Sequence, residues 1–173
     1  FDRLKSRVEE LASEIGAVSP GECIMLACAK TLVDFPEFNS RFADGRLRKY
    51  TSVNLSFAIN INRKGLRTPV IRDTNQHDQA GLSKAVKGLA LKYLRDELSG
   101  EDLRDGTFTV SDLSTMGVTM FTPVINDRQS AILGICSPPP GSDWFNLILA
   151  FDHRVAAGML AAQFLESLEA SLF

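Results

Sequence analysis

Apolar residues recur every three or four positions in four parts of the chain, which is the spacing of an amphipathic helix. Ser19 followed by Pro20 is typical of a helix start, and Asp78 is a suitable cap for a later helix. The residue before a proline avoids helical geometry, so the second helix should end near Phe35. The predicted helices span residues 1–16, 20–35, 82–98 and 158–172.

Other segments alternate apolar and polar residues, or are short and apolar, as strands are. Pro69 places its segment at a sheet edge or a strand start, because proline cannot donate to a strand ladder. Residues 39–45 and 63–65 have the composition of loops or turns. The predicted strands span 47–50, 52–61, 66–71, 107–113, 130–136 and a largely buried 144–151.

This order of elements predicts an α/β fold, a two-layer sandwich in which a mixed, largely antiparallel sheet is covered by helices on one side. The 173 residues suit a single domain, 1–173, and are enough to bury a sizeable core. No internal repeat or low-complexity tract is visible.

Hydrophobic residues make up 45% of the chain and charged residues 23%, as is typical of a globular protein. No apolar run approaches the roughly 20 residues that span a bilayer, so membrane insertion is not expected. The net charge of −2 gives no general attraction to nucleic acid. The local cluster of Arg46, Arg48 and Lys49 is expected to be a solvated turn.

Three cysteines, Cys23, Cys28 and Cys136, cannot all pair, and each lies in an apolar segment where a free thiol packs as a small hydrophobe. This pattern favours a reducing compartment. The chain has two histidines, His77 and His153, and no cysteine pair at zinc-finger spacing, so no metal site is expected.

His153 lies where the apolar run 144–151 gives way to the last predicted helix. Backbone groups of such a turn can orient one nitrogen of a histidine ring while the other faces a cleft. A histidine ordinarily titrates near pH 6.5, which suits it to accept a proton at neutral pH. His153 is therefore a candidate general base, although an isolated histidine is also commonly a hydrogen-bonded structural residue.

Seven segments support a family resemblance. They include Phe-Pro-Glu-Phe-Asn at 35–39, Gly-Leu-Arg-Thr-Pro-Val-Ile-Arg-Asp at 65–73 and Phe-Asp-His-Arg-Val at 151–155; the others are 50–61, 106–113, 121–126 and 131–134. In this order, over nearly the whole chain, they resemble the catalytic domain of the 2-oxo acid dehydrogenase dihydrolipoyl acyltransferases, the E2 components. These belong to the chloramphenicol acetyltransferase-like superfamily, of which the chain is identified as a divergent member.

The resemblance implies acyl transfer between a dihydrolipoyl thioester and coenzyme A, with lipoamide and coenzyme A as substrates. It implies that His153 removes the proton of the attacking thiol and that Ser111 donates to the developing oxyanion. In this family the two residues come from neighbouring subunits, so a homotrimer or a larger core is also implied. Further implied partners are a lipoyl-bearing domain and the E1 and E3 subunits, in the cytoplasm or, in a eukaryote, the mitochondrial matrix.

Several positions depart from the family pattern. In its motif His-x-x-x-Asp-Gly, the acidic position is Ala157, whose methyl group cannot orient a partner. Asp112 stands where an asparagine is usual, Ser114 where a glycine is usual, and the connection 134–144 is shorter than the usual hairpin. The family's N-terminal helix and strand are also missing ahead of this segment, which predicts a sheet with an exposed edge.

Three functional hypotheses stay open. The chain is an active acyltransferase that uses His153 and Ser111. Alternatively, it is an E2-like scaffold that forms a core without turnover, as the residues Ala157, Asp112 and Ser114 suggest. A third hypothesis is a related acyltransferase with another acceptor, because the superfamily uses the same histidine for amine, hydroxyl and carrier-bound acceptors.

Overall fold

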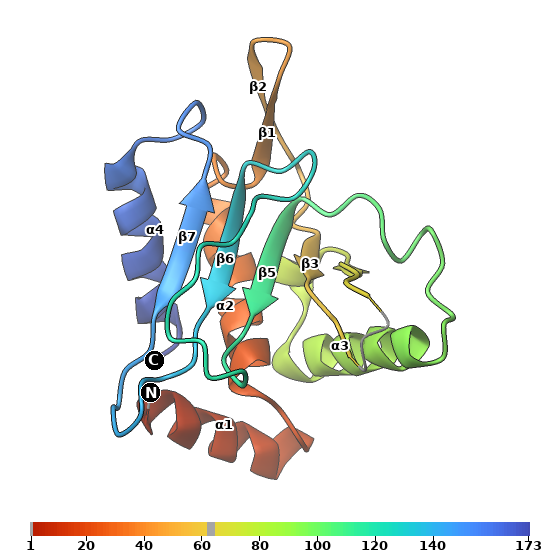
Figure 1. Ribbon diagram of the computed structural model, residues 1–173, viewed down its shortest axis with the longest axis vertical. Helices are drawn as coiled ribbons and strands as arrows, with labels where there is room; N and C mark the ends of the chain where they lie inside the picture. The colour runs from red at the N-terminus through yellow and green to blue at the C-terminus, as the bar shows by residue number, and fades with distance from the viewer. Residues whose placement is uncertain (1, 62–64) are drawn as a thin grey trace.

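The computed structural model describes residues 2–61 and 65–173. Five strands form one sheet: β3 (Leu55–Phe57), β4 (Val70–Ile71), β5 (Phe108–Asp112), β6 (Ala131–Ile135) and β7 (Leu147–Phe151). Their order is β4-β3-β5-β6-β7 (Figure 1). β3 and β5 pair in parallel, as do β5 and β6, whereas β4 and β7 are antiparallel to their neighbours.

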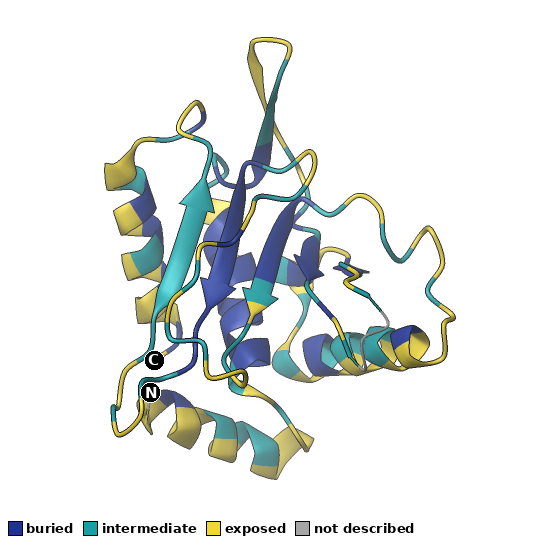
Figure 2. Ribbon diagram, viewed as in Figure 1, coloured by how far each residue is buried: buried dark blue, intermediate teal, exposed yellow. Residues whose placement is uncertain are grey.

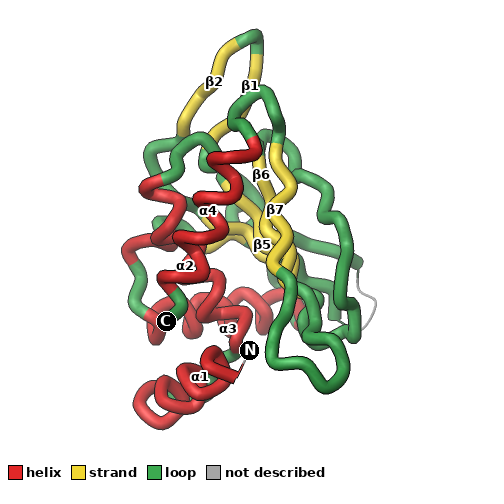
Figure 3. Tube along the Cα trace, turned by 90° about the vertical axis from the view of Figure 1, so that its left-hand side faces the viewer, coloured by secondary structure: helices red, strands yellow, loops and turns green. Residues whose placement is uncertain are grey.

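Four α-helices and a short 3-10 helix complete the fold: α1 (Asp2–Ile15), α2 (Pro20–Asp34), η1 (Thr74–Gln76), α3 (Gln79–Leu94) and α4 (Gly158–Ser171). The helices lie on one side of the sheet and loops cover the other side (Figure 3). This arrangement confirms the predicted two-layer α/β sandwich. Within its mixed sheet the parallel pairs are as many as the antiparallel ones.

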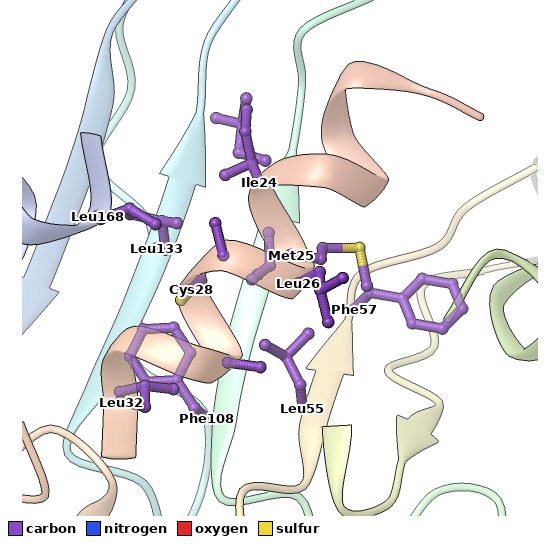
Figure 4. Close-up of a cluster of buried hydrophobic side chains, with 14 of the residues drawn as sticks. Ile24, Met25, Leu26, Cys28, Leu32, Leu55, Phe57, Phe108, Leu133 and Leu168 are labelled. Carbon is purple, nitrogen blue, oxygen red and sulfur yellow. The ribbon is translucent and has the colours of Figure 1, made fainter. Parts of the chain in front are cut away.

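α2 lies at the centre of the core. It begins with a capping box, in which Ser19 Oγ accepts from Glu22 N and the Glu22 carboxylate accepts from Ser19 N, both at 3.1 Å. Most of its side chains are buried, because the sheet lies on one face and α3 and α4 flank it. Figure 4 shows core residues of α2, the strands and α4: Ile24, Cys28, Leu32, Leu55, Phe108, Leu133 and Leu168.

Aromatic rings join α4 to the sheet. The buried Phe164 ring packs edge-on against Phe35 and Phe38, with centroids 5.6 and 5.3 Å apart, and Phe108 of β5 lies at 6.4 Å. Phe38 also packs on Phe151, the last residue of β7. These contacts fix α4, and the turn that precedes it, against the end of the sheet.

The predicted helices are confirmed, with differences at both ends of α3, which begins at Gln79 instead of residue 82. Asp78 caps this helix as expected, its Oδ1 accepting from Gly81 N at 2.7 Å. The helix ends at Leu94 instead of residue 98, because Asp96 adopts a left-handed φ of 59°, through which a right-handed helix cannot continue.

Within the described residues, no single helix is long and apolar enough to cross a membrane. α1 and α2 satisfy the length and composition of a span only as a pair, and that pair is bent by 95° at its break.

The loop predicted over 39–45 is wrong for its first part. β1 (Ser40–Ala43) and β2 (Arg46–Lys49) form an antiparallel hairpin that projects from the sheet (Figure 1). Asp44 and Gly45 between them have positive φ values of 54° and 70°, as a two-residue hairpin turn requires. The true turn is therefore limited to Asp44 and Gly45. The sequence did not predict β1, because a strand of four residues has too few apolar positions to show alternation.

The strand predicted over 52–61 is reduced to the three residues of β3. Asn54 explains the late start, because its N donates to Thr107 Oγ1 and its Nδ2 to the Asp105 carbonyl oxygen, both at 3.0 Å. Beyond Phe57, an isolated bridge joins Ile59 to Arg67. Side chains on both faces of β3 are buried, so the alternation in sequence does not mark a solvent-facing side.

β7 is shorter than the strand predicted over 144–151, and it is half-buried instead of buried (Figure 2). The reason is its place at the edge of the described sheet, whereas β6 beside it is buried throughout. β4 is the other edge strand, directly after Pro69, as predicted. Residues 63 and 64 of the turn predicted at 63–65 lie outside the described residues.

Replacing Phe164 with alanine should lower the free energy of unfolding by about 3–5 kcal/mol, because a fully buried ring is lost and a cavity is left. Urea unfolding followed by circular dichroism measures the change. Leu91→Ala removes a side chain that is 51% exposed and serves as the control, with an expected change of about 0.5 kcal/mol or less. Equal losses in the two variants would contradict a structural role for the aromatic cluster.

Candidate active site

His153 lies in the turn between β7 and α4, at the strand exit that the sequence predicts. The turn is attached to the start of β6, where Asp152 N donates to the Ser130 carbonyl oxygen at 2.8 Å. The exposed imidazole packs on Phe151, with ring centroids 4.6 Å apart. Neither ring nitrogen hydrogen bonds to another described residue, so both are available to a substrate or a second subunit.

Asp152 and Arg154 form an ion pair on either side of His153. Arg154 Nε and Nη2 donate to Asp152 Oδ2 at 2.9 and 2.6 Å, and these hydrogen bonds hold the pKa of Asp152 below its ordinary value. The Arg154 guanidinium also lies 4.5 Å from the centre of the Phe42 ring on β1, a cation–π contact. The hairpin therefore braces the turn that presents the histidine.

Ser111 lies near the end of β5, on the face of the sheet opposite the helices. Its neighbour Val110 is buried in the core, whereas Ser111 is partly exposed, as the alternation along a strand requires. In the part of the chain that the structure describes, the Ser111 hydroxyl makes no hydrogen bond. It is available to donate to an atom that binds on this face.

A single chain keeps Ser111 and His153 apart. Ser111 is paired with Gly134, and Gly134 with Ile148, so Ser111 is level with Ile148 on β7. Phe151 lies three residues further along, a distance of about 10 Å, and His153 lies beyond it. Figure 1 shows that β5 and β7 end at opposite ends of the sheet. The two residues cannot act on the same bond within one chain.

Ala157, the position where the family pattern has an acidic residue, is the N-cap residue of α4. Its backbone is extended, with φ −93° and ψ 161°, and no side chain caps the helix. An aspartate at this position could accept from a backbone N–H of the first turn. With alanine at this position, α4 begins without a side-chain cap directly after the histidine turn.

Asp112 and Ser114, the other departures from the pattern, contact each other. Ser114 N donates to Asp112 Oδ1 at 2.8 Å, which closes a turn after β5. Asp112 Oδ2 occupies the space that a Cβ on Gly21 would need, in the first turn of α2. A carboxylate is favourable there, because the start of a helix has partial positive charge. The Asp112 carboxylate therefore fixes the backbone after Ser111, through its contacts with Ser114 and with the start of α2.

A polar cleft of about 640 Å³ opens where β3, β5 and β6 begin, the same end of the sheet as His153. Arg41, Arg104 and Arg128 line it. Arg128 pairs with Asp127 at 3.5 Å, and Arg104 pairs with Glu101 at 2.7 Å. Arg41 has no ion-pair partner among the described residues, and its guanidinium interacts with the Tyr50 hydroxyl, which lines the same cleft.

The remaining candidate groups form no second site. Burial raises the pKa of Cys23 to about 11 and that of Cys136 above its ordinary value, so neither is a thiolate at neutral pH. His77 is half-buried, with Nε2 3.2 Å from the Arg72 carbonyl oxygen. Over 2–61 and 65–173, no group of three or more His, Cys, Asp or Glu side chains could hold a metal ion.

Comparison with known proteins decides the family. Residues 2–172 match the family described as 2-oxoacid dehydrogenases acyltransferase (catalytic domain). The chain belongs to this family. The resemblance drawn from the seven sequence segments is therefore confirmed.

Curated relatives of this acyltransferase-family chain are components of pyruvate dehydrogenase complexes. The dihydrolipoyllysine-residue acetyltransferase component of Rickettsia bellii is 35% identical over 158 residues, covering 86% of this chain and 38% of the relative. The mitochondrial component of Dictyostelium discoideum is 33% identical over 177 residues, covering 95% of this chain and 28% of the relative. The chain thus spans well under half the length of these relatives.

Solved structures of the same family superpose closely. The dihydrolipoamide acetyltransferase of Azotobacter vinelandii has a TM-score of 0.87 and 30% identity, covering 99% of this chain and 75% of that chain. The cubic core of the pyruvate dehydrogenase multienzyme complex has a TM-score of 0.83 and 30% identity, with coverage of 99% and 74%. Chloramphenicol acetyltransferase, at a TM-score of 0.66 and 17% identity, confirms the fold class.

The Azotobacter vinelandii structure addresses the role of a serine, a histidine and an asparagine in the catalytic mechanism of that enzyme. Its histidine and asparagine are four positions apart, as are His153 and Ala157. Its serine precedes the histidine by 52 positions, whereas Ser111 precedes His153 by 42. The catalytic roles of His153 and Ser111 in this chain stay predictions.

The sequence did not reveal two supports of the histidine turn, Phe42 and Phe151. Phe151 had a visible signal, since it precedes His153 by two residues and side chains two apart share a face of a strand. Phe42 had none, because its contact with Arg154 joins distant parts of the chain.

The variant Ala157→Asp should stabilise the chain by about 1 kcal/mol, because the carboxylate can cap α4. Urea unfolding at neutral pH measures the gain. Ala157→Val adds bulk without a hydrogen-bond acceptor and should give no gain. A midpoint that does not rise in the aspartate variant would contradict the assignment of Ala157 as an uncapped N-cap.

The variant Arg154→Gln should raise the pKa of Asp152 toward its ordinary value, because the guanidinium is the main cause of the lowering. Carboxyl NMR titration measures it. A lowered carboxyl pKa stabilises the fold above the unfolded-state value, and this contribution is lost as the pH falls through the folded-state pKa. The stability difference between wild type and variant should therefore disappear in strong acid. An unchanged Asp152 titration would show that the ion pair does not form in solution.

Proposed function

We propose that this chain transfers an acyl group between a dihydrolipoyl thioester and coenzyme A, at a site shared by two subunits. The observation that supports this most directly is the placement of His153 and Ser111 at opposite ends of one sheet. Both groups lack hydrogen-bond partners among the described residues. In a member of this acyltransferase family, a second copy that packs against the first can bring the two groups together.

The histidine acts as the general base. As the thiol sulfur attacks the thioester carbonyl carbon, His153 accepts the thiol proton; a free thiol with a pKa of about 8.5 is otherwise mostly protonated. A new carbon–sulfur bond forms, and the carbonyl electron pair moves to oxygen. Collapse of this intermediate breaks the bond to the leaving sulfur, which takes the proton back from the imidazolium. The same steps operate in both directions.

Ser111 of the neighbouring subunit stabilises the intermediate. Its hydroxyl donates to the oxyanion, where a single donor commonly contributes two to three orders of magnitude in rate. No internal hydrogen bond with a described residue has to break first. The backbone turn formed by Asp112 and Ser114 fixes the strand end from which the hydroxyl projects.

Coenzyme A carries phosphates, and the cleft at the His153 end offers a site for them. A guanidinium binds phosphate through two parallel hydrogen bonds, and Arg41 has no competing carboxylate among the described residues. Residues 129 and 130 connect this cleft to the histidine turn, through the hydrogen bond from Asp152 N to Ser130. The phosphates and the reacting thiol would therefore bind on the same side of the molecule.

Self-assembly into a homotrimer, or a larger core built from trimers, is part of this proposal. The cubic core of a pyruvate dehydrogenase complex is one of the structural relatives. Partners would be a lipoyl-bearing domain and the E1 and E3 subunits. The relatives belong to bacterial and mitochondrial complexes, so the location would be the cytoplasm or the mitochondrial matrix.

A core-forming domain without turnover is a second candidate, and Ala157 favours it. The related enzyme studied for catalysis has an asparagine at the same spacing from its histidine, whereas Ala157 offers no polar group. This candidate requires the same oligomer but no acyl transfer. The two functions therefore differ in one measurable property, turnover.

Formation of S-acetyldihydrolipoamide from acetyl-CoA and dihydrolipoamide tests the proposal. His153→Ala should remove activity, and Ser111→Ala should lower kcat by about two to three orders of magnitude. His77→Ala, at a loop histidine outside the proposed site, should retain wild-type activity. An oligomer without turnover in the wild type would favour the scaffold, and full activity in His153→Ala would rule out this mechanism.

A further inference from the structure

The loop-covered face of the sheet has a distinctive arrangement beside Ser111. Side chains alternate along β5 and β6, so that Val110 and Leu133 point into the core and Ser111 and Gly134 face the other way. Ser111 and Gly134 are directly paired in the parallel ladder. The position next to the serine hydroxyl therefore has no side chain of its own.

The Phe121 ring fills that position. A Cβ built on Gly134 would lie 2.8 Å from Phe121 Cζ and 3.2 Å from its Cε1, so the ring occupies space that any other residue at 134 would need. Two hydrogen bonds fix the backbone just before Phe121, and in the first Ser137 N donates to the Val118 carbonyl oxygen at 2.7 Å. Asn146 Nδ2 donates to the Thr119 carbonyl oxygen at 2.8 Å.

Adjacent strands lie about 4.8 Å apart, so a ring seated on Gly134 borders the Ser111 hydroxyl. On the same face, two residues away, the Thr109 hydroxyl already donates to Gln129 Oε1 at 2.6 Å. An acyl group whose carbonyl oxygen accepts from Ser111 would therefore place its alkyl chain near the Phe121 ring, whose backbone segment is fixed by hydrogen bonds.

We propose that Phe121, seated on Gly134, sets the size of the acyl group that can bind beside Ser111. This inference rests on the proposed acyl transfer and adds a residue that determines specificity. The ring does not take part in proton transfer or bond making. It limits the space for the alkyl chain. Because Gly134 has no side chain, the ring can lie close to the sheet and leave room beside Ser111.

The test compares acetyl-, propionyl- and butyryl-CoA as donors to dihydrolipoamide in the oligomer, with kcat/KM for each. Phe121→Ala should raise the butyryl-to-acetyl ratio of kcat/KM by at least about tenfold. A methylene group that fits into an apolar pocket commonly raises kcat/KM by on the order of tenfold or more. Met120→Ala is the matched control, since this neighbouring side chain is 73% exposed, and its ratio should equal that of wild type. Phe121→Leu, which keeps more of the packing, should shift the ratio in the same direction by a smaller factor.

A reciprocal variant tests the contact itself. Gly134→Ala should push the ring toward the acyl space and lower the butyryl-to-acetyl ratio. Adding Phe121→Ala to it should restore a ratio above that of wild type, because the new methyl group no longer meets a ring. Loss of fold alone would reduce all donors together and leave the ratio unchanged.

Outcomes separate this inference from the function on which it rests. Wild-type transfer with ratios that stay constant in Phe121→Ala and Phe121→Leu would overturn the role of Phe121 and leave acyl transfer standing. No transfer from any donor in the wild type would overturn the proposed function, and the specificity role would fall with it.

Discussion

The directions of three strands determine how this molecule can work. β6 is parallel to β5 and antiparallel to β7, so a residue near the end of β5 and a residue beyond the end of β7 lie at opposite ends of the sheet. Ser111 and His153 occupy these two positions. The helices cover one face of the sheet, and the alternation along β5 places Ser111 on the other face. Under the proposed function, a chain with this topology shares each acyl-transfer site with a neighbouring subunit, so that catalysis requires assembly.

Contacts within the chain fix the backbone around His153 and around Ser111. The histidine turn is held by the ion pair of Asp152 and Arg154 and by the aromatic rings on both sides of it. The end of β5 is held by Asp112, which contacts Ser114 and the start of α2. Ala157 is the exception, because it leaves the helix after the histidine without a cap. The departures from the family pattern thus weaken one helix start and leave the two reactive groups in ordered surroundings.

The sequence predicted the layers of the fold well, because helix spacing and the caps Ser19 and Asp78 are local signals. It failed where long-range contacts decide the local structure. Asn54 uses its polar atoms to join separate loops, which shortens β3, and the hairpin before it depends on a two-residue turn. His153 and Ser111 could be named from the family motif. Their separation could not, because it follows from the strand register, and the Phe121 contact with Gly134 has no sequence signal.

The proposed active site combines His153 of one subunit with Ser111 of another. Co-expression of His153→Ala and Ser111→Ala chains under two tags, with tandem purification of mixed oligomers, tests it most directly. In a trimer that contains both kinds of chain, about one interface in three combines the intact His153 of one chain with the intact Ser111 of the other. If the site is shared, the mixed trimers should recover acetyl transfer to about a third of the wild-type rate, although each parent is nearly inactive. Mixed oligomers as inactive as their parents would contradict a shared site.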